Sequence, residues 1–506
     1  MPNEKSPFYE RYVEEPFVRE NTFRGREADR SFPANFPESR AALPAPYWEG
    51  HDDAIECYWK VWDLAFRNLT RVHKGNGFVA PYIDTAFNDC LFMWDSAFIL
   101  MFCRYGRRAY DFQRTLDNFY AKQHPDGFIT REIREWDGVD QFHRFDPVST
   151  GPDILGWCEW EYYLNFGDKA RLAEVFPALA AYHRWMRRYR TWPDGSYWSS
   201  GWGCGMDNQP RVPAGDDERW QHGHMSWIDA TAQAVLSARM LVKMAEVLGR
   251  GAEVADEQDE IRRLTEYMNR FMWNEEMQFY ADRFRDGSVS GTKTIGAFWT
   301  LLAQVATPER IEALATHLDD SNSFKSAHRV PSLSVDNAVY SAKGEYWRGS
   351  VWPPTNYMVL RGLTAAGLDK LAAEIGRNHH KYVVETYLET GTVWENYAPA
   401  GVGRGSESKG DFVGWGGVGP IAVFLEYVIG LRPDVPGNRL VWDVTLTEAH
   451  GVKAYPYGAD GVLDLGVARR KKATDKPDIK VTSKVSVTLE VRWAGGAETI
   501  EVSAGR

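Results

Sequence analysis

The chain has 506 residues, and 14% of them are aromatic, including 21 tryptophans. So many rings exclude a disordered, collagen-like or low-complexity protein. The net charge of −11 argues against nucleic acid or an anionic membrane as a partner, because both require a basic surface. The composition therefore indicates a large globular protein that is rich in tryptophan.

Residues 1–49 are predicted to form an extended arm over the main body, because seven prolines fall there without a helical period. They show neither the basic nor the apolar region of a signal peptide. The longest nearly apolar run, residues 295–306, is too short to cross a bilayer. The five cysteines form no CxxC motif, which favours reduced thiols and a cytoplasmic location.

Residues 50–432 alternate between two kinds of helical segment. The segment 226–248 is apolar around most of its circumference, whereas 252–272 is charged and carries a single apolar stripe. The first kind must be buried on nearly all sides, and the second packs on one side only. The predicted helices are 52–72, 92–105, 107–121, 152–166, 177–190, 226–248, 252–272, 294–305, 307–317, 354–367, 369–390 and 419–430. Twelve helices of two alternating kinds predict a mainly α protein with two concentric rings of six, an (α/α)6 barrel.

The C-terminal part, residues 433–506, changes to short alternating runs with turn residues between them. These runs lie at 439–446, 461–467, 479–483, 485–493 and 499–502. They predict a small antiparallel β-sheet cap, which is either a separate module or a sheet packed on the barrel.

Three long loops, 191–225, 319–353 and 391–418, are unusually rich in Trp and Gly. Structureless loops of this length are uncommon and are usually functional or disordered. Dense aromatic content argues against disorder. In an (α/α)6 barrel such loops would crowd one end of the inner ring, so candidate catalytic residues are expected there.

Asp207 lies in the first of these loops, in the sequence GCGMDNQPR, with Trp198 and Trp202 nearby. Desolvation among indole rings disfavours the charged form of a carboxylic acid and raises its pKa, as a general acid near neutral pH requires. Composition alone favours the alternative that Asp207 is a turn residue, because Asp-Asn pairs favour turns.

Glu395 lies in the third loop, in GTVWENYAP, beside Trp394 and Tyr397. Considered alone, it is more simply explained as a solvated or helix-capping glutamate. The pair is more informative, because two loop carboxylates bracketed by aromatic residues fit a glycosidase that uses two carboxyl groups. Tryptophan faces stack on the apolar faces of sugar rings, and polar side chains bond the hydroxyl groups.

Two further segments fit the same picture. FMWDS opens a helix, and its alternative interpretation is an N-cap aspartate beside a core tryptophan. EYWRGSVWPPTN precedes another helix, and its alternative is a packed surface loop. The candidate sugar contacts in these segments and in the loops are Trp94, Asp95, Trp202, Arg211, Trp347, Arg348, Trp352, Asn356, Trp394 and Trp415.

No cofactor and no metal ion are expected. His222 and His224 form a spaced pair without a recognisable third ligand, and a metal site is normally built from more ligands. The glycine-rich turn at 412–417 lacks a phosphate-binding pattern. The absence of a GxSxG motif argues against a serine hydrolase of the α/β type.

Five motifs taken in order, MWDSAF, GCGMDNQPR, YWRGSVWPPTNY, WENY and FVGWGG, resemble those of glycoside hydrolase family 63-type bacterial glycosidases. That group includes mannosylglycerate and glucosylglycerate hydrolases, with trehalases as more distant relatives. The resemblance covers about residues 50–430. It implies an (α/α)6 barrel that hydrolyses an α-glycoside with inversion, with Asp207 as general acid and Glu395 as general base. It also implies a sugar site lined by Trp94, Asp95, Trp347, Arg348, Trp352 and Trp415.

The expected function is therefore an inverting α-glycosidase for a small α-glucoside or α-mannoside, either a disaccharide or a glycosylglycerate. The expected partner is a small carbohydrate, and the sequence leaves open whether the protein is a monomer or a homo-oligomer. Two alternatives stay open. One is a phosphorylase, lyase or epimerase on the same barrel, and the other is a carbohydrate-binding protein without catalysis.

Overall fold

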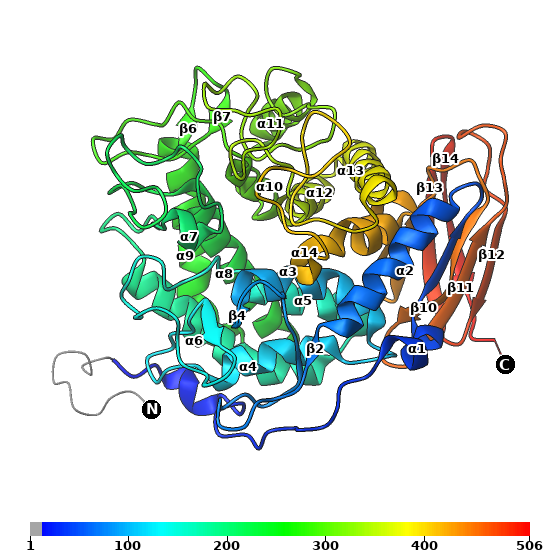
Figure 1. Cartoon of the computed structure of the whole chain (residues 1–506), viewed down its shortest axis with the longest axis horizontal. Coiled ribbons are helices and arrows are strands. Elements are labelled where there is room, and N and C mark those ends of the chain that lie inside the picture. The colour runs from blue at the N-terminus through cyan, green and yellow to red at the C-terminus, as the bar shows by residue number, and fades with distance from the viewer. Residues whose placement is uncertain (1–12, 506) are drawn as a thin grey trace.

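The computed structural model describes residues 13–505, and it is mostly helical with a C-terminal β region (Figure 1). Each of the twelve predicted helices corresponds to a helix of the structure. These are α2 (Asp52–Arg67), α3 (Met93–Cys103), α4 (Thr115–Ala121), α5 (Leu155–Phe166), α6 (Lys169–Tyr189), α8 (Ile228–Leu248), α9 (Ala255–Phe271), α10 (Trp299–Leu302), α11 (Pro308–Asp319), α12 (Pro353–Ala365), α13 (Asp369–Thr390) and the π-helix η7 (Val418–Val428). Of the short α-helices, α1 (Phe36–Ser39) precedes them, and α7 (Gly201–Cys204) and α14 (Val413–Gly416) lie between them.

Six of the helices contact one another in a closed order around the helical body. Helix α3 contacts α5, α5 contacts α8, α8 contacts α10, α10 contacts α12, α12 contacts η7, and η7 contacts α3 again. The burial of the helices follows the sequence pattern. Most residues of α8 are buried, whereas α9 buries only a few, among them Leu264 and Met268. The all-round apolar helix therefore lies inside, and the charged helix packs against it from outside.

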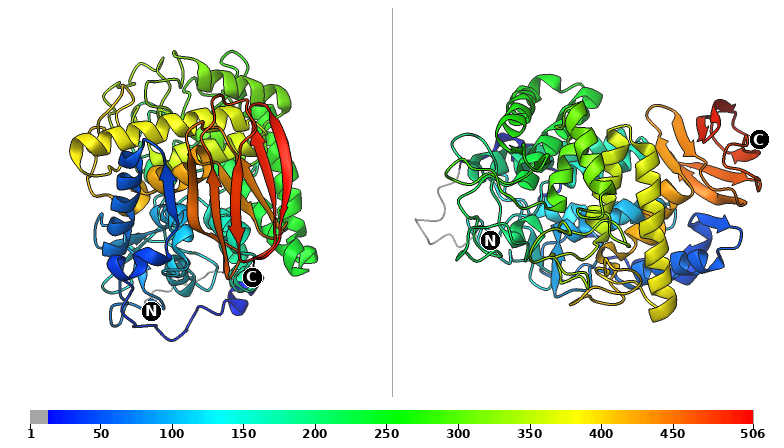
Figure 2. Two further views of the ribbon diagram at one scale, coloured as in Figure 1. Left: turned by 90° about the vertical axis from the view of Figure 1, so that its right-hand side faces the viewer. Right: turned by 90° about the horizontal axis from the view of Figure 1, so that it is seen from above.

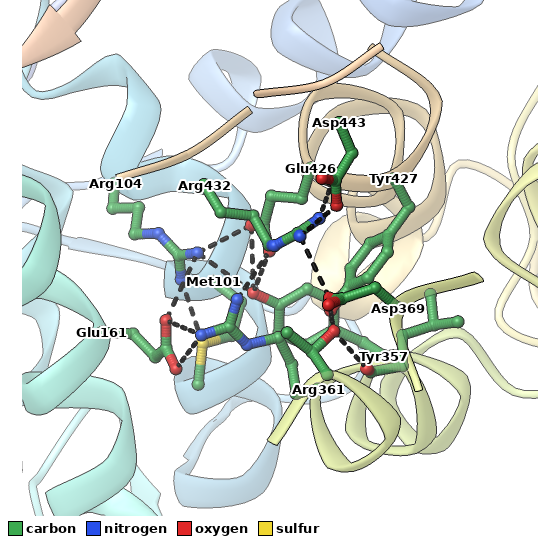
Figure 3. A network of polar contacts seen from close by, with 12 residues as sticks. Met101, Arg104, Glu161, Tyr357, Arg361, Asp369, Glu426, Tyr427, Arg432 and Asp443 are labelled. Carbon is green, nitrogen blue, oxygen red and sulfur yellow. Dashed lines mark hydrogen bonds and ion pairs between the residues drawn. The ribbon is translucent and has the colours of Figure 1, made fainter. Parts of the chain in front are cut away.

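Buried ion pairs join the inner helices at their core (Figure 3). Glu426 of η7 accepts a 2.7 Å bond from Arg104, which follows α3, and lies 3.3 Å from Arg361 of α12. Arg361 also pairs with Glu161 of α5 at 2.7 Å. The Tyr357 hydroxyl of α12 donates to Glu426 at 3.0 Å. Charges this deeply buried require partners, so the network fixes these helices relative to one another.

The β region contains two four-stranded sheets at one side of the helical body (Figures 1 and 2). One has the order β1-β10-β11-β12 and the other β14-β13-β9-β8. The strands are β1 (Ala45–Trp48), β8 (Leu431–Asp434), β9 (Arg439–Asp443), β10 (His450–Tyr457), β11 (Gly461–Val467), β12 (Ile479–Ser483), β13 (Val487–Trp493) and β14 (Gly496–Val502). Short two-stranded pairs elsewhere are β2 (Leu69–Thr70) with β3 (Tyr82–Ile83), β4 (Cys90–Phe92) with β5 (Glu132–Arg134), and β6 (Trp273–Asn274) with β7 (Phe279–Tyr280).

The β region differs from the predicted antiparallel cap in two respects. Strands β9 and β13 pair in parallel, because the chain crosses to the other sheet between them and returns in the same direction. The region also recruits a strand from the N-terminal segment, since β1 pairs with β10. One hydrophobic cluster contains helical residues such as Trp62 and strand residues such as Leu465 and Leu489. The sheets are therefore packed on the helical body and share its core.

The predicted N-terminal arm falls partly on residues 1–12, which lie outside the described residues. The remainder runs along the body in short turns, beginning with η1 (Pro16–Glu20), which contacts α6. Phe17 and Phe23 are buried there. None of the helices within residues 13–505 combines the length and apolar character that a membrane span requires.

Candidate active site

A cavity of about 450 Å³ opens where the three long loops meet the start of α3. The first loop contributes Asp207, the second Tyr346 and the third Glu395. Asp95 in the first turn of α3 lines the same cavity. Residues from four distant parts of the sequence therefore converge on one hollow of the size that small-molecule sites have.

The local chain path around α7 places Asp207 in the cavity. The Ser200 hydroxyl accepts a bond from the Gly203 N–H at 3.1 Å and so begins this short helix. Gly205 ends it with φ +74°, and a Cβ atom at that position would lie 3.2 Å from the Trp94 indole. A glycine is thus needed both for the left-handed turn and for the close approach of Trp94. The chain then turns so that Asp207 faces the cavity beside this indole.

Burial raises the pKa of Asp207 to about 6, and the nearby cations Arg131 and Arg219 oppose that rise. Desolvation disfavours the carboxylate, whereas a neighbouring guanidinium stabilises it. The balance leaves a carboxyl group that is partly protonated near neutral pH. Asp207 therefore has the electrostatic setting that the sequence predicts for it.

Glu395 is only 3% exposed and is held by four hydrogen bonds. Its carboxylate accepts from the Lys409 N–H at 3.2 Å and from the Tyr346 hydroxyl at 3.3 Å. Its backbone N–H donates to the Lys409 carbonyl at 2.9 Å, and its carbonyl accepts from the Trp415 indole at 2.7 Å. This environment excludes the alternative of a solvated glutamate.

Burial raises the pKa of Glu395 to about 7, and the negative charge of Asp207 acts in the same direction. The hydrogen bonds from Lys409 and Tyr346 oppose the rise because they favour the ionised form. Two carboxyl groups with pKa values near neutrality thus face one cavity. Neighbouring charges shift both values: Arg131 and Arg219 lower the pKa of Asp207, and Asp207 raises the pKa of Glu395.

Two more carboxyl groups, Asp95 and Glu132, line the cavity. The N-cap of α3 is Phe92, so Asp95 lies inside the first turn, and the alternative that it caps the helix is wrong. Burial and the charges of Glu395 and Glu132 raise the pKa of Asp95 well above its ordinary value. Glu132 pairs with Arg131. Four carboxyl groups, those of Asp95, Glu132, Asp207 and Glu395, therefore line one cavity and can accept hydrogen bonds there.

Aromatic side chains form two walls of the cavity. On one wall the rings of Trp347 and Trp352 stack in parallel at 3.9 Å, and Trp415 meets Trp352 edge-on at 5.8 Å. On the other wall Trp202 packs against Trp220 at 4.7 Å. All five tryptophans line the cavity. Aromatic walls with polar groups between them suit a ring that has apolar faces and a hydroxylated edge.

The family model of the mannosylglycerate hydrolase MGH1-like glycoside hydrolase domain matches residues 90–411, which is more than half of the chain. The chain belongs to this glycoside hydrolase family. The matched range contains all the residues that line the cavity except Phe87, Asn88, Phe412 and Trp415. The family membership confirms the resemblance to family 63-type glycosidases, and it makes the protein a glycosidase.

The chain is similar to several known proteins. The mannosylglycerate hydrolase of Thermus thermophilus is 24% identical over 390 residues, which cover 62% of this chain and 90% of that protein. A probable mannosyl-oligosaccharide glucosidase of Schizosaccharomyces pombe is 26% identical over 284 residues, covering 48% of this chain but only 33% of the longer relative. A crystal structure of a Thermus thermophilus mannosylglycerate hydrolase in complex with glucose has a TM-score of 0.57 at 23% identity, covering 73% of this chain and 99% of that one. At that identity the structural likeness concerns the fold.

The cavity of this family member brings together eight of the twelve residues that the sequence predicts as catalytic or sugar-binding. These are Trp94, Asp95, Trp202, Asp207, Trp347, Trp352, Glu395 and Trp415. The other four, Arg211, Arg348, Asn356 and Trp394, lie outside the lining and have other partners. Trp198, which the sequence pattern also associates with Asp207, packs against Trp192 and His222 instead.

Each of the four outlying residues has a structural reason for its position. Arg211 is buried between Asp229 and Asp282, with contacts of 2.7 Å to each. Arg348 donates to the Asn208 carbonyl at 3.0 Å and so ties the second loop to the first. Asn356 exchanges hydrogen bonds with the backbone of residue 330. Trp394 donates from its indole to the Thr390 hydroxyl at 3.0 Å. As sugar contacts, these four predictions differ from the structure.

Sequence reasoning missed the wall that β5 and its neighbours provide. Arg131, Glu132, Gln141 and Phe142 line the cavity there, and Trp220 joins them from the first loop. Arg131 donates to the Trp202 carbonyl at 2.7 Å and so connects this wall with the loop that carries Asp207. The segment TREIREW places two charged residues before each apolar one and lacks the strict alternation of a strand, so the sequence offered no clear signal for this wall.

The histidine pair does not resemble a metal centre. His222 and His224 lie edge to face at 4.6 Å, and His222 packs against Trp192. Within residues 13–505, no group of three or more histidine, cysteine or acidic side chains has an arrangement that could hold a metal ion.

Proposed function

We propose that the protein is an inverting α-glycosidase in which Asp207 protonates the leaving oxygen and Glu395 activates water. The observation that carries this proposal is the presence of both carboxyl groups in one aromatic-walled cavity, each with its pKa raised toward neutrality by burial. An inverting enzyme needs a protonated acid on one side of the sugar and an ionised base with its water on the other.

The proposed scaffold is an (α/α)6 barrel. The closed order of contacts among six inner helices supports it, as do the outer helices that alternate with them in the sequence. We take residues 50–432 as the catalytic unit, with residues 1–49 as an arm and 433–506 as a cap. In such a barrel the helix starts and connecting loops meet at one end, which agrees with a cavity formed by three loops and the start of α3.

The proposed substrate is a small α-glucoside or α-mannoside, of the disaccharide or glycosylglycerate type. The names of the family relatives, mannosylglycerate hydrolase and mannosyl-oligosaccharide glucosidase, support these two sugars. A cavity of about 450 Å³ fits one or two sugar-sized groups better than a polymer. An epimerase that relies on histidine is disfavoured, because none of the cavity-lining side chains within residues 13–505 is a histidine.

The proposal is tested with Asp207→Asn and Glu395→Gln on a panel of α-linked disaccharides and glycosylglycerates. Each variant should lose about 10²–10⁴-fold in kcat, the usual contribution of a positioned acid or base, while circular dichroism stays unchanged. Glu389→Gln, on an exposed carboxylate at the end of α13, is the matched control and should keep full activity. Proton NMR should detect the β-anomer as the first product. An α-anomer as first product, or near-normal rates in both variants, contradicts the assignment.

A further inference from the structure

The tryptophans that line the candidate active site differ in their exposure. Trp220 is 42% exposed, whereas four others are at most 7% exposed, namely Trp94, Trp347, Trp352 and Trp415. A lining residue that keeps so much contact with solvent lies at the opening of a cavity, and the buried ones line its interior. The part of a substrate that reaches outward therefore meets Trp220.

Backbone and ring contacts hold Trp220 in place despite its exposure. The N–H of Trp202, in α7, donates to the Arg219 carbonyl at 3.1 Å, so the residue before Trp220 is bound to that helix. The Trp220 ring packs against Trp202 at 4.7 Å and meets Phe142 edge-on at 6.1 Å. The same short helix comes shortly before Asp207 in the chain. One piece of backbone therefore positions both Trp220 and the proposed general acid.

The proposed general acid decides which part of the substrate lies along this wall. Asp207 must come within hydrogen-bond reach of the leaving oxygen, to which the leaving group is attached. Arg131 donates to the Trp202 carbonyl at 2.7 Å and lowers the pKa of Asp207, so the wall and the acid are neighbours. The leaving group then extends along Trp202 toward Trp220, and the sugar that receives water lies among the buried tryptophans. This step rests on the proposed function.

The charges around this wall do not suit an anionic leaving group. Within residues 13–505, Arg131 is the only basic side chain that lines the cavity. It pairs with Glu132 and donates to the Trp202 carbonyl, so its guanidinium is already engaged. Arg219 influences the pKa of Asp207 but does not line the cavity. Four carboxyl groups line it, and those that are ionised repel a further carboxylate. The leaving group that fits is therefore uncharged.

The side chains at the opening suit a ring that carries hydroxyl groups. Gln141, next to Phe142 in the sequence, is exposed and lines the cavity, and its amide can both donate and accept. Phe142 and Trp220 add apolar ring surface. A pyranose has C–H faces for the rings and hydroxyl groups for the amide, whereas glycerate is a short chain with a negative charge. We propose that the leaving group is an uncharged pyranose that stacks on Trp220, so that Trp220 selects α-linked disaccharides over glycosylglycerates.

The test compares three substrates that share one sugar, the glucose or mannose that the full-length protein cleaves faster. Their leaving groups are a second sugar, methanol and glycerate. The value of kcat/KM should be highest for the disaccharide. In Trp220→Ala, the ratio of kcat/KM for the disaccharide to that for the methyl α-glycoside should fall about tenfold, the loss typical of one aromatic contact. Trp220→Phe keeps a ring and should recover most of this ratio.

Trp136→Ala is the matched control, because Trp136 is also an exposed tryptophan but does not line the cavity. Its substrate ratio should equal that of the wild type. A glycosylglycerate hydrolysed as fast as the disaccharide overturns the proposal, and so does an unchanged ratio in Trp220→Ala or an equal fall in Trp136→Ala. In those cases the glycosidase assignment stands, because substrate is turned over. Failure of the wild type to hydrolyse any of the three substrates contradicts the proposed function itself, and the assignment of the leaving group falls with it.

Discussion

The Tyr346 hydroxyl contributes to the pH at which the proposed base, Glu395, is ionised. It donates to the Glu395 carboxylate at 3.3 Å and so lowers the pKa of Glu395. Even so, burial keeps that pKa at about 7, above the value of about 6 for Asp207. Under the proposed roles, the active form of the enzyme has the weaker acid ionised and the stronger acid protonated.

This order makes the active form a minority species. The rate rises with pH as Glu395 ionises and falls as Asp207 loses its proton, so the profile is a bell centred near pH 6.5. Treating the two groups as independent, about 6% of the enzyme is in the active form at that centre. Because the charges interact, the two limbs belong to the pair and not to either residue alone.

Tyr346→Phe removes one donor from Glu395 and should raise its pKa. A bond to a charged acceptor contributes ~1.5–3 kcal/mol, and this long one is taken as about 1 kcal/mol, which raises the pKa by about 0.7. The maximum of kcat/KM should then fall about fourfold, and the optimum should move to higher pH by about 0.35. Both changes follow from the same protonation equilibrium.

The assay is kcat/KM on the best α-glycoside from the substrate panel, measured between about pH 4.5 and 9 at constant ionic strength. Tyr340→Phe is the matched control, because Tyr340 lies in the same loop but outside the cavity lining. A uniform loss at every pH, with the optimum unmoved, would mean that Tyr346 only binds substrate. An optimum that moves to lower pH would refute the inference that the Tyr346 hydroxyl lowers the pKa of Glu395.

Three further substitutions test the structural basis of the site. Gly205→Ala places a Cβ in a left-handed turn 3.2 Å from Trp94. It should lower the free energy of unfolding by about 1–2 kcal/mol in urea titrations and raise KM in kinetic assays. Unchanged stability would refute the argument that this turn requires glycine. Glu426→Gln leaves two buried guanidinium groups short of a partner and should lower unfolding free energy by about 3–5 kcal/mol. Arg211→Met should also destabilise by about 3–5 kcal/mol while changing KM little in the folded enzyme; a tenfold rise in KM with normal stability would return Arg211 to sugar binding.

The helices were predictable because burial imposes a period on the sequence. The all-round apolar pattern of α8 and the single stripe of α9 each correspond to the observed packing. Boundaries were less predictable. The predicted helix corresponding to α6, 177–190, begins at Pro177. The helix in fact begins at Lys169, after Asp168 caps it, and continues through Pro177.

That Asp207 and Glu395 line one cavity was predictable, because each lies in a motif within a long aromatic loop. The site was not predictable where the partner is distant in the chain. The sequence around Arg211 does not indicate that its partners are Asp229 and Asp282, which hold its side chain away from the cavity. The same holds for Arg131, whose position depends on a short strand pairing between β4 and β5. The direction in which a side chain points depends on partners brought close by folding, and the local sequence does not specify them.

Two contacts between segments far apart in the sequence bear on how the protein folds during synthesis. Strand β1 pairs with β10, about 400 residues later, and α3 completes its ring of neighbours only through η7. Contacts of such long range form slowly, because a large loop must close before they stabilise anything. A chain emerging during synthesis thus carries α3, whose residues are all buried in the folded protein, without its last neighbour until residue 428 has been made. Assembly of the candidate active site is consequently a late event, and the unfinished chain is the form most exposed to aggregation.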